Sequence, residues 1–81
     1  MPAEAETRPR DLQALERRLM LILRDGGFDK LLLILLDSAH NRRLVRAYSE
    51  SLAALFAIPP NRALDRLGAG VEPEGSALLL I

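Results

Sequence analysis

Two runs of aliphatic residues, 19–23 and 31–36, constrain the fold of this chain more than any other feature. No polar or charged residue interrupts either run. A helix that is apolar on all sides has to be buried on all sides. Both runs are far shorter than the roughly 20 apolar residues that span a bilayer, and charged residues separate them. We therefore expect a folded core built around both runs, no membrane span and a cytoplasmic protein.

The leucine content favours helices over strands. Leucine accounts for 18 of the 81 residues, whereas the chain has only two valines and one threonine. Leucine is a strong helix former, and strand-rich domains rely on β-branched and aromatic residues. The composition therefore predicts an all-α fold. The less favoured alternative is a β-hairpin with strands at 19–23 and 31–36 around Asp25-Gly26-Gly27.

Helix signals divide the chain into a small antiparallel bundle. Leu12, Leu15 and Leu19 recur at helical spacing. Pro9 suits the first turn, with Thr7 or Arg8 as the cap, and Gly26 suits a left-handed end. The predicted bundle has three main helices and a short fourth, over residues 9–25, 29–37, 39–57 and 62–67.

Capping residues and prolines set the remaining boundaries. Asp29 suits the start of the second helix, and Asp37 or Ser38 suits the start of the third. Pro59-Pro60 ends the third helix. The alternative is a single helix over 29–57, with Asn41 as a polar residue in a coiled-coil-like seam.

Both ends of the chain are expected to lie outside this helical domain of residues 9–67. Residues 1–8 are small or charged and lack an apolar period, which predicts a disordered leader. Residues 68–81 are rich in glycine, which predicts a flexible tail. The tail ends in Leu78, Leu79, Leu80 and Ile81. This apolar end either folds back onto the bundle or docks on a partner, where it could add a strand.

One copy of a three-helix bundle cannot bury both aliphatic runs completely. Each buried leucine contributes about 2 kcal/mol, so leaving four to six exposed would forfeit roughly 8 to 12 kcal/mol. That loss is comparable to the whole stability of a small domain. We therefore expect a homodimer or higher oligomer that completes the bundle. The expected interface residues are Leu19, Ile22, Leu23, Leu31, Ile34 and Leu35.

No pattern in the chain indicates catalysis or a bound cofactor. Asp37, Ser38 and His40 are the residue types of a nucleophilic triad, but near neighbours on one helical turn point in different directions. The chain has no cysteine and one histidine, so we expect no metal site and no cofactor. These observations favour a non-catalytic interaction module that scaffolds, chaperones or regulates another protein as a homo-oligomer.

Arginines form a compact basic cluster at Arg42, Arg43 and Arg46. Such a cluster suits either a solvated helix face or contacts to phosphate or to a partner. Eleven basic residues balance eleven acidic ones, which argues against a protein whose main task is to neutralise phosphates. A small nucleic-acid-associated regulator is therefore the alternative function. An apolar ligand between leucine-rich helices is a further, weaker possibility.

Overall fold

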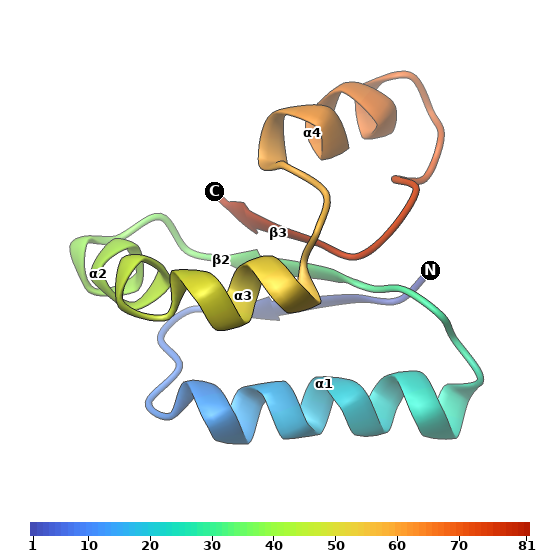
Figure 1. Ribbon diagram of the computed structural model, residues 1–81. Coiled ribbons are helices and arrows are strands. Elements are labelled where there is room, and N and C mark those ends of the chain that lie inside the picture. The colour runs from blue at the N-terminus through green and yellow to red at the C-terminus, as the bar shows by residue number, and fades with distance from the viewer.

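A computed structural model describes all 81 residues as a three-stranded parallel sheet with helices on both faces (Figure 1). The strand order is β1-β2-β3. The elements along the chain are β1 (Ala3–Glu6), α1 (Leu12–Gly26), β2 (Leu32–Leu35), α2 (Ala39–Ala47), α3 (Ser49–Leu55), α4 (Pro60–Gly68) and β3 (Ala77–Leu80). The predicted all-α helical bundle is therefore wrong, and the fold is a mixed α/β fold.

The aliphatic run 31–36 forms the central strand β2 rather than the predicted helix 29–37. Leu33 and Leu35 belong to the core cluster that includes α1, whereas Leu32 belongs to the cluster that includes α4. A central strand of a parallel sheet is buried on both faces and reads as a continuous apolar run. Such a run looks the same in sequence as a helix buried on all sides. The hairpin alternative is also wrong, because 19–23 lies in α1 and all strand pairs are parallel.

The two chain ends form the outer strands of the sheet. β1 lies inside the expected leader 1–8, and β3 lies inside the expected flexible tail 68–81. Ala3 pairs with Leu32, and Leu32 pairs with Ala77. The apolar end of the tail thus adds a strand to the sheet of its own chain. Each of these strands has only 4 residues, too few to show a clear apolar period in the sequence. Backbone pairing with β2 fixes both of them in the sheet.

The core consists of two layers of leucine and alanine, one on each face of the sheet. Figure 1 shows α1 below the sheet, α4 above it, α3 in front and α2 at the left. The lower layer consists of Leu12, Leu15, Leu19, Leu31, Leu33, Leu35, Leu52 and Leu78. The upper layer consists of Leu32, Ala63, Ala77 and Leu79.

The capping residues of α1 place both ends of this helix slightly differently from the prediction. Asp11 caps α1 and accepts hydrogen bonds from the backbone N–H groups of Gln13 (3.0 Å) and Ala14 (3.3 Å), so the helix begins after the predicted residue 9. At its end, Gly27 rather than Gly26 adopts the left-handed conformation, with φ of 69°. Glycine enters this region without the steric cost that a Cβ atom brings.

The long helical segment predicted for 39–57 is two helices. The capping role of Ser38 is confirmed, because its hydroxyl accepts the backbone N–H of Asn41 at 3.1 Å. α2 ends at Ala47 and α3 begins at Ser49, with Tyr48 between them in a non-helical conformation. The single helix over 29–57 is wrong. Helix α4 begins at Pro60, as a proline in the first turn allows.

Candidate functional site

The second half of α1 carries more apolar surface than the sheet can cover. Leu19 points into the core and is buried, whereas Met20 is 57% exposed and Leu21 is 46% exposed. A helix packed on one face of a sheet buries only one stripe of its surface. The remaining apolar side chains of the run 19–23 therefore stay at the surface of a single copy.

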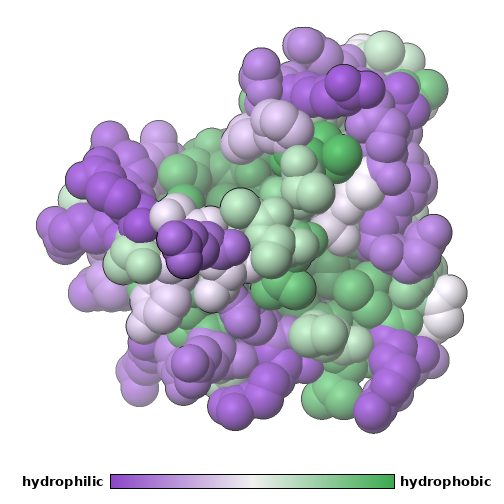
Figure 2. Space-filling model, in the orientation of Figure 1, coloured by the Kyte–Doolittle hydropathy of each residue, from purple (hydrophilic) through white to green (hydrophobic).

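Met20 belongs to a continuous apolar surface that also includes the end of α3 and the linker to α4. One groove contains Met20, Leu23, Leu55 and Phe56, and a second hollow contains Phe56 and the linker, so Phe56 joins the two. Figure 2 shows this green surface between the purple side chains of α2, α4 and the base of the molecule. We call it the apolar face and define it as Met20, Leu23, Leu55, Phe56, Ala57, Ile58, Pro59 and Pro60.

The linker reaches this position because it lies along the outer side of β3. Ile58 forms a parallel bridge with Ala77, and its backbone N–H donates to the carbonyl of Ser76 at 3.3 Å. Pro59 and Pro60 then start α4 on the other face of the sheet. The linker therefore covers part of the edge of β3, and the hollow beside it has a volume of about 230 Å³.

The residues predicted to form the oligomer interface lie mostly inside one copy. Leu19, Leu31 and Leu35 are buried in the lower core layer. Leu35 is buried because it belongs to the central strand β2. Ile22 and Leu23 are partly buried against the same layer, and Ile34 is partly buried against the upper one. Three of these six residues, Leu19, Leu23 and Leu31, line the groove beside Met20, and Leu23 is the one of the three that is not fully buried.

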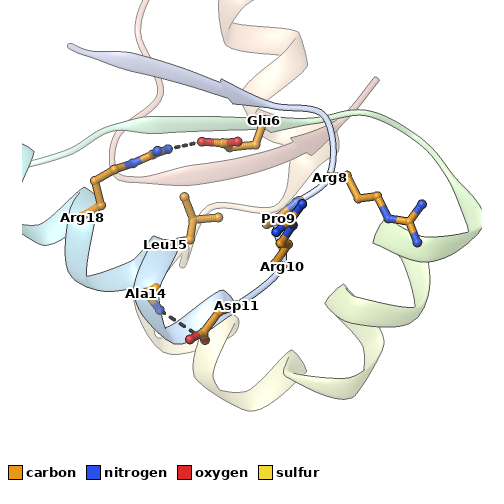
Figure 3. A pocket seen from close by; sticks show the side chains of 8 residues that line it. All are labelled: Glu6, Arg8, Pro9, Arg10, Asp11, Ala14, Leu15 and Arg18. Carbon is orange, nitrogen blue, oxygen red and sulfur yellow. Dashed lines mark hydrogen bonds and ion pairs between the residues drawn. The ribbon is translucent and has the colours of Figure 1, made fainter.

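An arginine-lined pocket of about 450 Å³ lies where β1 leads into α1 (Figure 3). Its charged lining residues are Glu6, Arg8, Arg10, Asp11 and Arg18. Arg18 donates to the carboxylate of Glu6, which raises the pKa of Arg18, and Asp11 caps α1. The guanidinium group of Arg8 points away from Glu6 and Arg18 in Figure 3. Glu6, Asp11 and Arg18 therefore already have partners, whereas Arg8 and Arg10 make no ion pair.

The residues Asp37, Ser38 and His40 have local structural roles. Asp37 forms an ion pair with Arg42, at 3.0 Å between Oδ1 and Nε. The hydroxyl of Ser38 caps α2, and Nε2 of His40 lies 3.4 Å from the carbonyl oxygen of Pro9. No group of three or more His, Asp or Glu side chains is placed to hold a metal ion.

The arginine cluster predicted at Arg42, Arg43 and Arg46 is exposed along α2. Arg42 is held by Asp37, whereas Arg43 and Arg46 make no ion pair. Contact between this cluster and nucleic acid stays a prediction from the sequence.

Asn41 has a structural role that was not among the predicted site residues. Its side chain is completely buried, and its Nδ2 group donates to the carbonyls of Thr7 and Leu36, each at 2.8 Å. These carbonyls directly follow β1 and β2, so the side chain ties together the carboxyl ends of two strands. The Oδ1 atom has no hydrogen-bond partner. The sequence offered one signal, since Asn41 is the polar residue that interrupts the apolar seam in the long-helix alternative.

An ion network joins the opposite, amino ends of the strands. Glu72 accepts from the amino group of Met1 and lies 3.2 Å from Nζ of Lys30, so it links the segments before β1, β2 and β3. These hydrogen bonds lower the pKa of Glu72. Arg62 of α4 donates at 2.8 Å to Glu74, which lies in the same loop as Glu72, and this hydrogen bond lowers the pKa of the Glu74 carboxyl.

No helix of the chain is both long enough and apolar enough to cross a membrane. Comparison of the chain with known protein families, with curated proteins and with solved structures finds no match.

Proposed function

We propose that the chain is a non-catalytic interaction module that forms a homodimer through the apolar face. The observation that carries this proposal is the continuity of the face across α1, α3 and the linker. Contiguous exposed apolar surface of this kind marks interaction sites, because water contact with it is unfavourable.

The shape of the apolar face favours a second copy as its occupant. A two-fold dimer places the same patch on both sides of the interface, so the patch has to fit itself. Met20 projects from α1, and the hollow beside Phe56, Pro59 and Pro60 is open. Methionine is flexible and fills irregular apolar spaces. Met20 of each copy can therefore enter the hollow of the other.

The charge of the chain also favours self-association. The eleven basic and eleven acidic residues cancel, so two copies carry no net charge that would repel them. Glu16 is the one charged residue that lines either hollow, and its side chain stays partly exposed, so the surface that loses water is mainly apolar. Such a dimer keeps the exposed arginines of α2 and the β1 side of the sheet free, as a scaffold or regulatory module requires.

Light scattering after size-exclusion chromatography at micromolar concentration tests the dimer. We expect the wild-type chain to elute as a dimer and the variant Met20→Glu to elute as a folded monomer. Met20 is 57% exposed, so a charge is tolerated there in a single copy but not in a closed apolar interface.

The matched control is Leu64→Glu, because Leu64 is 52% exposed and lies on α4 outside the apolar face. This variant should remain a dimer. A wild-type chain that stays monomeric at these concentrations would contradict the proposal, and so would a Met20→Glu variant that still forms the dimer.

A further inference from the structure

The outer edge of β1 has backbone groups that no other segment pairs. The amides of Leu32 and Leu36 donate to the carbonyls of Pro2 and Glu6, at 2.9 and 3.1 Å. In a strand, alternate residues direct their backbone groups to opposite sides. Glu4 and Glu6 therefore bond to β2, and the N–H and C=O groups of Ala3 and Ala5 point outward. The sheet ends at β1, so nothing in the chain occupies that side.

Apolar surface lies next to this open edge on the face that α4 occupies. A hollow of about 240 Å³ is lined partly by Ala5, Ile34, Leu36 and Ile81. Leu36 is 51% exposed and Ile81 is 64% exposed. α4 packs on β3, and it leaves the β1 side of this face uncovered. The methyl groups of Ala3 and Ala5 are too small to fill the space.

The opposite face of β1 is acidic. Glu4 and Glu6 are half-buried there, beside α1. Arg18 donates to Glu6 and also interacts with the charge of Glu4, but the carboxylate of Glu4 has no hydrogen-bond partner. A cation placed opposite Glu4 would gain a favourable cross-strand pair.

We propose that an extended segment of another protein adds to β1 as a fourth strand, with apolar and basic side chains in alternation. The backbone of this segment pairs with Ala3 and Ala5. Its apolar side chains lie over the hollow at Ile34 and Leu36, and its basic side chains lie beside Glu4. Backbone pairing at a sheet edge supplies affinity, and alternate side chains supply specificity.

A second copy of the chain suits this edge poorly. Directly opposite residues in an antiparallel pair share one face of the sheet, so β1 against β1 would place Glu4 opposite Glu4 or Glu6. Like charges in that arrangement are destabilising. Alanine would also face alanine, which leaves the hollow empty. The edge strand thus discourages self-pairing, as charged edge strands commonly do.

The test uses a labelled synthetic peptide of alternating valine and lysine, with alternating valine and glutamate as its control, read by fluorescence anisotropy. We expect the wild-type chain to bind the lysine peptide in preference to the glutamate peptide. Ala5→Pro should weaken binding roughly tenfold, because it removes one outward N–H and obstructs the approach of a strand. The N–H of Ala5 bonds to nothing in the sheet, and a proline is tolerated at such an edge position.

Two further variants separate charge recognition from loss of structure. Glu4→Lys should reverse the preference between the two peptides, whereas Glu50→Lys, on exposed α3, should leave it unchanged. Thermal melts should show that Ala5→Pro remains folded. Absence of binding to the lysine peptide would overturn the proposal, as would unchanged affinity in a folded Ala5→Pro variant. Light scattering on the same samples measures the proposed dimer independently of peptide binding. The linker of the apolar face lies along β3, and β1 is at the opposite edge of the sheet.

Discussion

At position 41, a single amide side chain holds two strand ends together. Replacing Asn41 with alanine removes both donors and leaves the carbonyls of Thr7 and Leu36 without these bonds. The two hydrogen bonds are partly buried, and an acceptor left without a partner in such a place costs up to about 1–3 kcal/mol. We expect Asn41→Ala to lower the free energy of unfolding by about 2 kcal/mol or more, measured by urea denaturation.

Asn61→Ala is the matched control for this substitution. Asn61 is exposed at the start of α4, and no side chain caps that helix. Its truncation should change the stability by less than about 0.5 kcal/mol. Equal effects of the two substitutions would show that the bonds of Asn41 contribute nothing specific to the fold.

Among the elements, β2 shows why the sequence predicted some of the fold and missed the rest. Local signals correctly indicated a helix that ends at Asp25-Gly26-Gly27, a cap at Ser38 and an interruption of the helices before Pro60, although α3 already ends at Leu55. Residues 31–36 form a strand because β1 and β3 pair with them along both edges. This pairing overrides the preference of leucine for helices. The Ala-Glu alternation of β1 was a visible period-two signal, but it covers only 4 residues. The apolar face combines side chains of α1, α3 and the linker, which lie side by side only in the folded chain.

Adjacent residues at the end of β2 should respond very differently to truncation. Leu35 is fully buried between β1 and β3, whereas Leu36 is 51% exposed. Leu35→Ala removes core packing and should cost about 2–5 kcal/mol. Leu36→Ala should cost less than about 1 kcal/mol. Chemical denaturation of both variants measures the contrast, and similar losses at the two positions would contradict the placement of β2.

The molecule as a whole is tied at both ends of its sheet, by Asn41 at the carboxyl ends and by Glu72 at the amino ends. These ties differ in their response to pH. The amide of Asn41 does not titrate, whereas the ion pairs of Glu72 require its carboxylate to be charged. Hydrogen bonds from the Met1 amino group and from Lys30 lower the pKa of Glu72 below its ordinary value of 4.5. The amino-end tie is therefore the one that acid can release.

The sign of this pH effect follows from linkage. A carboxyl whose pKa is lower in the folded state stabilises the fold above its unfolded pKa, and that contribution disappears as the pH falls through the folded value. We expect the midpoint of thermal unfolding to decrease as the pH falls below about 4.5. In Glu72→Gln the decrease should be smaller, and stability at neutral pH should already be reduced. The side chain is 52% exposed, so the effect is modest and high salt should weaken it.

Glu50→Gln, at an exposed carboxylate without an ion pair, should retain the wild-type pH dependence. If Glu72→Gln follows the wild-type pH profile as well, the strands are held at their amino ends by packing alone.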